Sequence, residues 1–369
     1  MEEAELNFLC SDAYWLSGKS HVYANTLSHE SKSITSKTPK TPSTKSPLIS
    51  ESILKNLPAH LFFQTSGSSG KPKWVAISKK AMLASAEAVN TQLSIAESDR
   101  WFIALPIFHV GGHSILARSF LKNSYPTVMR GRWNTRNFSQ QLHDSACAWV
   151  SLVPTQLADI VSHSLRAPNS LKGTILGGGS TNKETLQAAQ ELGWRVHQSY
   201  GMTEAGSQIA TATIPGGTMK ILPHMQCEVD QDNRLSWKST SQFSGYIIEE
   251  EFVPLSTSEN GWFKTQDRVS LQNNGGELAF LSRADRIVKI LGELVDVEQL
   301  ELEINQSSDQ QVILILEPDI RRGYRITPCV EKAPSEALEH QFTLYKGTQS
   351  LEKVLTQPFK RSALGKIMI

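Results

Sequence analysis

Short apolar runs alternate with segments of helical periodicity between Leu61 and Gly201, and this alternation constrains the fold more than any other feature. Runs such as Trp101–Leu105 and Trp149–Val153 have the length of a buried strand, and each is followed by a proline. Ser78 is placed to cap a helix whose apolar residues recur at intervals of three or four. An alternation of this kind predicts an α/β fold in which helices cover a sheet.

The pattern changes after Arg283, where the sequence predicts a smaller α+β region. A pair of strands at 286–297 is followed by an acidic helix at 298–305, an apolar strand at 312–316 and a helix near 335–345. We therefore expect a separate small domain at the C-terminal end.

Residues 28–50 differ in composition from the rest of the chain, because most of them are Ser, Thr, Lys or Pro. Such a segment cannot bury enough apolar surface to offset the entropy lost on ordering. We interpret it as a linker or a long surface loop. The predicted organisation is an N-terminal remnant of the large domain at 1–27, this linker, the large domain at 51–283 and the small domain at 284–369.

Composition places the chain among soluble, cytoplasmic proteins. Lys and Arg total 37 and Asp and Glu total 36, which argues against nucleic acid or a membrane surface as the main partner. No apolar run approaches the roughly 18 residues of a membrane span, and the acidic N-terminus is unlike a signal peptide. The four cysteines are too scattered for a metal site or a disulfide framework, which favours a reducing cytoplasm.

The segment Thr-Ser-Gly-Ser-Ser-Gly-Lys-Pro-Lys at residues 65–73 is the strongest candidate for a binding site. Its glycines let the backbone approach a ligand, and its hydroxyl and N–H groups can donate to phosphate oxygens. It is not a Walker loop, because Thr65 stands where the first glycine is required and Pro72 follows Lys71. A flexible loop between two strands is the alternative. The candidate phosphate-binding residues are Thr65, Ser66, Gly67, Ser68, Ser69, Gly70 and Lys73.

Two further segments place a carboxylate where a nucleotide could meet it. Glu204 ends Ser-Tyr-Gly-Met-Thr-Glu after a predicted strand, and beside the Thr203 hydroxyl it could hold Mg²⁺ between phosphates. Asp267 ends Gly-Trp-Phe-Lys-Thr-Gln-Asp and could accept two hydrogen bonds from a ribose diol. Taken alone, the two segments are better interpreted as a polar helix start and a turn aspartate.

Five segments occur together in an order that chance does not explain. They lie at 65–73, 200–204, 262–267, 283–292 and Gly365-Lys366. In this order they resemble the adenylate-forming superfamily, which includes acyl-CoA synthetases, adenylation domains and luciferases. The resemblance covers residues 61–369 and implies an α/β fold, with a large adenylate-forming domain of β-sheets covered by helices and a small mobile α+β lid domain.

Three shorter segments narrow the resemblance. Residues 105–112, 151–157 and 175–179 are similar to the o-succinylbenzoate–CoA ligases of menaquinone biosynthesis. This resemblance implies two steps. A carboxylate attacks the α-phosphate of Mg-ATP to give an acyl-adenylate and pyrophosphate, and coenzyme A then displaces AMP to give a thioester. ATP, Mg²⁺ and coenzyme A, the last as a substrate, are the small molecules implied.

The resemblance assigns most candidate residues to the nucleotide. Thr65 to Gly70 and Lys73 would hold the β- and γ-phosphates, and Glu204 with the hydroxyl of Thr65 or Thr203 would position Mg²⁺. The nucleotide base would be met by Gly177, Gly178, Gly179, Ser180 and Tyr200, with Gly201 and Met202 also in the nucleotide site.

The remaining roles implied by the resemblance concern the sugar, the reaction and the substrate. Asp267 would bind the ribose hydroxyls with help from Arg283. Lys366 would bridge the attacking carboxylate and the α-phosphate, and Asp285 would be the hinge of the small domain. His109 would line the acyl pocket.

Several residues depart from the family pattern. Gln266 replaces the usual glycine before the ribose-binding aspartate, and Ser282 and Arg286 replace two residues of the hinge motif. Glu293-Leu294 departs from the polar or basic pair often found near coenzyme A. Alternatives therefore stay open: a ligase for another aryl or acyl acid, an enzyme that loads a carrier protein, and a degenerate nucleotide-binding protein. Association into a homo-oligomer is also left open.

Overall fold

The structure is a computed structural model that describes residues 1, 3–23, 49–66, 72–290, 293–308, 310–319, 321, 323–346, 351, 354–361 and 367–368. The chain divides into two compact units. Unit 1 comprises Met1–Cys227, Trp237–Phe263 and Gln272–Leu278, and unit 2 comprises Glu228–Ser236, Lys264–Leu271 and Ala279–Ile369. The domain boundaries predicted after residues 27, 50 and 283 stay predictions.

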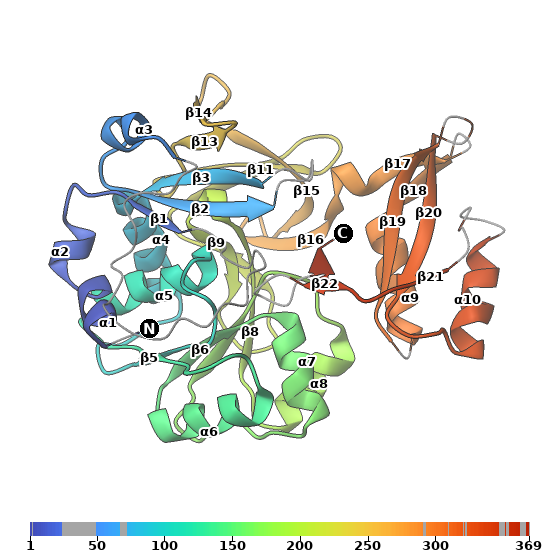
Figure 1. Cartoon of the computed structure of the whole chain (residues 1–369), viewed down its shortest axis with the longest axis horizontal. Coiled ribbons are helices and arrows are strands. Elements are labelled where there is room, and N and C mark those ends of the chain that lie inside the picture. The colour runs from blue at the N-terminus through green and yellow to red at the C-terminus, as the bar shows by residue number, and fades with distance from the viewer. Residues whose placement is uncertain are drawn as a thin grey trace, which may run out of the picture. The chain divides into compact units, whose positions relative to one another are not determined.

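The strands β5-β4-β6-β7-β8-β9-β10 of unit 1 lie in this order in an 11-stranded sheet. Figure 1 labels β5, β6, β8 and β9 of this sheet. Its strands from β5 to β8 are parallel, whereas β9 and β10 run antiparallel to their neighbours. Leu152 pairs with Leu176 and Leu176 with Gln198, so three carboxyl ends meet at one edge, where α/β folds bind ligands. The strands are β4 (Trp101–Ile103), β5 (Thr127–Val128), β6 (Trp149–Leu152), β7 (Gly173–Leu176), β8 (Val196–Met202), β9 (Ser207–Ala212) and β10 (Met219–Ile221).

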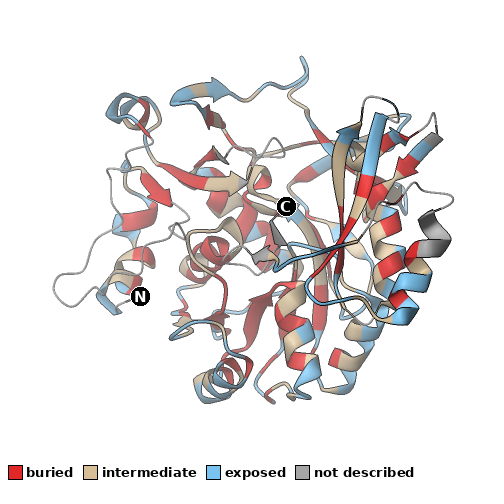
Figure 2. Cartoon of the chain, turned by 45° about the vertical axis from the view of Figure 1, so that its right-hand side comes forward, coloured by how far each residue is buried: buried red, intermediate tan, exposed pale blue. Residues whose placement is uncertain are grey.

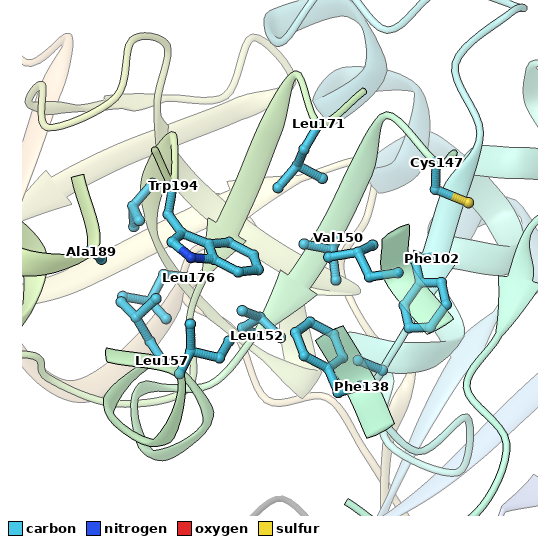
Figure 3. Close-up of a cluster of buried hydrophobic side chains, with 14 residues drawn as sticks. Phe102, Phe138, Cys147, Val150, Leu152, Leu157, Leu171, Leu176, Ala189 and Trp194 are labelled. Carbon is cyan, nitrogen blue, oxygen red and sulfur yellow. The ribbon is translucent and has the colours of Figure 1, made fainter. Parts of the chain in front are cut away.

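Three helices pack on this sheet through a shared apolar cluster (Figure 3). They are α6 (Thr135–Ser145), α7 (Pro154–Ser162) and α8 (Lys183–Glu191). Phe138 and Leu157 of the helices lie with Val150 and Leu176 of the strands, and all four are buried. Burial of such side chains contributes roughly 1.5–3 kcal/mol each, which fixes the sheet edge that carries the candidate site.

A second sheet of unit 1 has the order β1-β2-β3-β13-β14. Helices α4 (Lys79–Gln92) and α5 (Val110–Leu121) lie between the two sheets, because they contact each other, β3 of one sheet, and β4 and β9 of the other. Ser78 caps α4 as predicted, since its Oγ accepts from the backbone N–H of Ala81 at 3.1 Å. The strands are β1 (His21–Tyr23), β2 (His60–Ser66), β3 (Pro72–Ser78), β13 (Gly245–Ile248) and β14 (Glu251–Pro254).

The N-terminal residues are built into unit 1 through α1 (Glu3–Leu9), α2 (Asp12–Trp15) and β1. Strand β1 pairs in parallel with β2, Tyr23 opposite Phe63. The buried Lys79 donates to the backbone carbonyl of Tyr14. The Tyr14 hydroxyl bonds the Tyr23 hydroxyl at 2.6 Å and Nε2 of His113 at 2.8 Å. A buried polar network therefore holds this segment to α4 and α5.

Most of the predicted linker at 28–50 lies outside the described residues. Its last two residues belong to the folded unit. The Ile49 side chain is buried, and Ser50 caps α3 (Glu51–Asn56) by accepting from the N–H of Ile53 at 3.3 Å.

Unit 2 has an apolar core of its own, formed by two helices and short sheets. The strand pair, both helices and the apolar strand lie within a few residues of their predicted positions. Their bounds are η2 (Ala284–Arg286), β17 (Ile287–Ile290), β18 (Glu293–Asp296), α9 (Val297–Ser307), β19 (Val312–Asp319), β20 (Gly323–Val330), α10 (Glu336–Lys346), β21 (Leu355–Thr356), β22 (Lys360–Arg361) and β23 (Ile367–Met368). The predicted fold class, helix-covered sheets followed by a small α+β part, is confirmed.

Four strands contain residues of both units: β11 (Met225–Val229), β12 (Arg234–Ser239), β15 (Phe263–Gln272) and β16 (Glu277–Arg283). Strands β6 and β7 are buried along their whole length, whereas β14 is mostly exposed. Figure 2 shows buried residues concentrated inside the molecule and exposed residues on loops, helices and outer strands. None of the helices in the described part of the chain combines the length and the apolar character that a bilayer crossing requires.

Candidate active site

Three side chains of unit 1 meet at one carboxylate oxygen. Lys73 lies on β3, Glu204 lies in η1 (Thr203–Ala205) directly after β8, and Tyr246 lies on β13. The Lys73 Nζ is 3.4 Å from Oε1 of Glu204, and the Tyr246 hydroxyl donates to the same oxygen at 2.9 Å. The Lys73 Nζ also lies 3.8 Å from the centre of the Tyr246 ring. Two residues predicted to act on phosphate and metal are therefore adjacent.

The backbone explains why these residues converge. Strand β13 runs antiparallel to β3, with Tyr246 opposite Val75. Glu204 is held by its own main chain, because its carbonyl oxygen accepts from the N–H of Phe243 at 3.0 Å. Gly201, just before η1, must be glycine, since a Cβ there would lie 1.8 Å from the carbonyl oxygen of Ser207.

The electrostatics of the cluster leave the tyrosine neutral. Burial raises the pKa of Tyr246, and the neighbouring Glu204 carboxylate raises it further. The hydroxyl therefore keeps its proton at neutral pH and acts as a donor. The Lys73–Glu204 pair is partly exposed, with 30% and 14% of the two side chains accessible. Such a pair exchanges partners at little cost in free energy.

The predicted phosphate loop is described only at its two ends. Thr65 pairs with Lys73 across the β2–β3 ladder, and its Oγ1 donates to the Lys73 carbonyl oxygen at 3.4 Å. The side chain of Ser66 and all of Gly67, Ser68, Ser69 and Gly70 lie outside the described residues. Their predicted role in holding phosphate stays a prediction.

The predicted adenine-site residues share the carboxyl edge of the parallel strands. Residues 177–180 follow β7, and residues 200–202 end the neighbouring β8. The two segments touch, because Ser199 Oγ donates to the carbonyl of Leu176 at 3.2 Å. A Cβ at Gly177 would lie 2.6 Å from Ser199 Oγ, so a larger residue there would displace this hydroxyl from its bond to Leu176. The placement suits a planar ligand at this edge.

His109 precedes α5 at the N-cap position and lies six residues after β4 ends at Ile103. Its Nε2 is buried and has no hydrogen-bond partner among the described residues. Burial lowers the pKa of His109 to about 4. The imidazole is therefore neutral at pH 7 and could donate to or accept from an uncharged polar group of a substrate.

Unit 2 holds a second charged cluster around Arg283. Its Nη1 donates to Oδ1 of Asp267 at 3.1 Å, and its backbone N–H donates to Oε2 of Glu298 at 2.8 Å. Hydrogen bonds to Asp285 and the charges of the surrounding carboxylates raise the pKa of Arg283. The predicted ribose residue and the predicted hinge residue are thus joined through one cation. Lys366, the predicted catalytic lysine, lies outside the described residues.

Sequence reasoning missed Tyr246 and Glu298. Tyr246 follows Gly245 on the apolar strand β13, and this Gly-Tyr pair was the available signal. A Cβ added at Gly245 would lie 2.3 Å from the carbonyl oxygen of Val253. Glu298 lies at the start of the acidic helix α9, where it resembles any residue of an exposed helix face.

Glu204 is suited to a magnesium ion whose other ligands come from a bound phosphate group and water. Mg²⁺ in proteins is commonly held by one or two carboxylates, with phosphate and water oxygens as its other ligands. Within the described part of the chain, no group of three or more His, Cys, Asp or Glu residues is arranged to hold a metal ion. A single carboxylate beside a predicted phosphate loop is therefore the donor set that matches Mg²⁺ bound with a nucleotide.

The chain is similar in sequence to known ligases. The 2-succinylbenzoate–CoA ligase of Salmonella typhimurium is 32% identical over 280 residues, which are 73% of this chain and 57% of that protein. The ligase of the same name from Bacillus subtilis is 32% identical over 240 residues, 61% of this chain and 49% of that protein. The chain thus spans about half the length of the curated relatives it matches.

The chain is also similar to solved structures of o-succinylbenzoate CoA synthetase. The o-succinylbenzoate CoA synthetase of Bacillus subtilis, in complex with its acyl-adenylate intermediate, is 26% identical with a TM-score of 0.71 over 83% of this chain and 67% of that one. The same enzyme with ATP and a magnesium ion gives a TM-score of 0.69 at 26% identity, over 83% of this chain and 68% of that one. A model of the AMP-binding enzyme family matches residues 15–236, more than half of the sequence, and the chain belongs to that family.

Proposed function

We propose that this protein is an ATP-dependent carboxylate–CoA ligase, and that o-succinylbenzoate is its acid. The observation that carries the proposal is the convergence of Lys73 and Glu204 beside the phosphate-loop strands. The relatives named 2-succinylbenzoate–CoA ligase, and the solved relative holding ATP and magnesium, support the choice of reaction and acid.

In the first step a carboxylate oxygen bonds to the α-phosphorus of ATP, and the bond to the β-phosphate breaks to release pyrophosphate. In the second step the thiol sulfur of coenzyme A bonds to the acyl carbon, the thiol proton is lost, and AMP leaves. Negative charge gathers on phosphate oxygens in the first step, so positioned cations are the main catalytic device.

Each site residue has its own role in the proposed reaction. Lys73 and the loop after Thr65 hold the β- and γ-phosphates, and Asp267 accepts from the ribose hydroxyls. Mg²⁺, held by Glu204 and a hydroxyl of Thr65 or Thr203, would neutralise phosphate charge. Lys366 bridges the carboxylate and the α-phosphate, and His109 contacts the acid. We also propose that the protein is cytoplasmic, which its four free cysteines support.

A pyrophosphate-release screen over carboxylic acids, with and without coenzyme A, tests the proposal. We expect o-succinylbenzoate to give the highest turnover and coenzyme A to be acylated. A clear preference for a fatty acid or an amino acid would overturn the acid and keep the adenylation chemistry. Absence of pyrophosphate release with every acid would overturn both. Glu204→Gln should lower Mg-ATP use, whereas Glu97→Gln, an exposed carboxylate of the same unit, should not.

A further inference from the structure

We infer that Tyr246 is a positioning residue for the nucleotide site, an inference that rests on the proposed function. Its hydroxyl holds the Glu204 carboxylate in place, and its ring face lets the Lys73 ammonium move from that carboxylate to the phosphates of ATP. Both contacts are present on one side chain, at 2.9 Å from the hydroxyl and 3.8 Å from the ring centre.

The two partners of Glu204 differ in how firmly they hold it. The Tyr246 bond at 2.9 Å has the length of an ordinary hydrogen bond, whereas the Lys73 Nζ at 3.4 Å is farther than the 2.7–2.9 Å common for charged pairs. A carboxylate only accepts, so the phenol must be the donor. Tyr246 therefore fixes Glu204 more closely than Lys73 does.

Tyr246 is itself well fixed. It pairs with Val75 of β3 on one side and with Val253 of β14 on the other, so its strand lies inside the sheet. Its ring lies 4.8 Å from that of Phe243, centre to centre. The Phe243 N–H binds the Glu204 carbonyl, so residues 243–246 hold Glu204 at its main chain and at its carboxylate.

This arrangement has a consequence for ATP binding. The Glu204 carboxylate takes up part of the positive charge of Lys73, so opening of the ion pair when the nucleotide binds makes that charge available to the phosphates. A cation over an aromatic face tolerates a change of direction, because the attraction comes from the whole ring face. The hydroxyl keeps the carboxylate oriented toward the metal after the lysine has left, which is the role of groups that orient metal ligands.

Two substitutions separate the hydroxyl from the ring. Tyr246→Phe keeps the ring and removes the donor, and Tyr246→Leu removes both. Calorimetry should measure ATP binding with and without Mg²⁺, in the absence of any acid. We expect Tyr246→Phe to weaken Mg²⁺-dependent binding about tenfold or more, the cost typical of losing a group that orients a metal ligand, and to change Mg²⁺-free binding less than twofold. Tyr246→Leu should weaken both.

Tyr125→Phe is the matched control, because Tyr125 is an exposed tyrosine of the same unit whose hydroxyl only reaches the Glu3 carbonyl at 3.5 Å. It should bind ATP like the wild type. Unchanged Mg²⁺ dependence in Tyr246→Phe would overturn the inference, and so would an equal loss with and without Mg²⁺.

A cycle of Tyr246→Phe and Glu204→Ala, followed by chemical unfolding without nucleotide, tests the contact independently of the reaction. The effect of the double variant on the unfolding equilibrium constant should differ about tenfold from the product of the two single effects, as expected for a hydrogen bond to a charged group. If the two substitutions are coupled but the wild type shows no Mg²⁺-dependent ATP binding, the contact is supported and the proposed function is contradicted. Absence of coupling would contradict the inference itself.

Discussion

Arg283 holds Asp285 with two parallel hydrogen bonds, from Nε to Oδ1 at 2.9 Å and from Nη2 to Oδ2 at 2.7 Å. This is the bidentate geometry in which a guanidinium matches a carboxylate, and it leaves Nη1 for Asp267 at 3.1 Å. The proposed hinge residue and the proposed ribose residue therefore share one cation, each through its own nitrogens. A movement of Asp285 should therefore shift Arg283 and change its hydrogen bond to Asp267.

Asp267→Asn should weaken ATP binding about tenfold or more, since a hydrogen bond to a charged acceptor is replaced by one to a neutral amide. The wild type should also prefer ATP to 3′-deoxy-ATP, and the variant should lose that preference. Titration of both nucleotides measures this. Asp232→Asn, at an exposed position of the same unit, should preserve the preference. A variant that still discriminates would remove Asp267 from the ribose site.

Lys366→Ala should slow acyl-adenylate formation by about 10²–10³, the usual cost of removing one group that stabilises developing charge. The same variant should convert supplied acyl-adenylate and coenzyme A to thioester at a nearly normal rate, because the lysine would act only in the first step. Single-turnover assays of each step separate the two, with Lys332→Ala, an exposed lysine of unit 2, as control. Equal losses in both steps would indicate a role in folding or docking.

Unit 1 should lose stability in mild acid through His113. Burial lowers the pKa of this imidazole to about 3 from its ordinary 6.5. Below pH 6.5 the unfolded chain binds a proton that the folded chain excludes, so stability falls as the pH falls, by about 2 kcal/mol at pH 5. The groups facing it include Tyr14, Lys79 and His21.

All eight tryptophans lie in unit 1, so their fluorescence follows its unfolding. Between pH 7 and pH 5, His113→Asn should lose about 2 kcal/mol less of unfolding free energy than the wild type. His163→Asn, at an exposed position, should lose as much as the wild type. An identical loss in His113→Asn would show that His113 is protonated in the folded state.

Deletion of residues 28–48 should leave activity and stability nearly unchanged, because this polar, proline-rich segment has few apolar side chains to bury. Extending the deletion to residue 50 should be harmful, since it removes the buried Ile49 and the Ser50 cap of α3, which is worth about 1 kcal/mol. Thermal melting of the two deletions compares them. Loss of soluble protein in the shorter deletion would show that the segment is needed for folding.

Helix caps could be predicted from the sequence, whereas contacts between residues far apart in the sequence could not. The Ser78 and Asn182 caps each act on an N–H three residues later, so the local sequence contains the whole signal. The contact of Lys73 with Glu204 spans 131 residues, and only the resemblance to a family pointed to it. Tyr246 meets Glu204 across 42 residues, through strand pairing that no motif encodes.

The parallel pairing of β1 with β2 and the buried Lys79–Tyr14 contact have a consequence for the chain's connectivity. Residues 3–23 contact β2, α4 and α5 through this pairing and through the buried polar network. Residues 49–369 thus carry a binding surface for the N-terminal segment of the same protein. Two separately made fragments, 1–23 and 49–369, should assemble, and the activity of the mixture should saturate with peptide concentration.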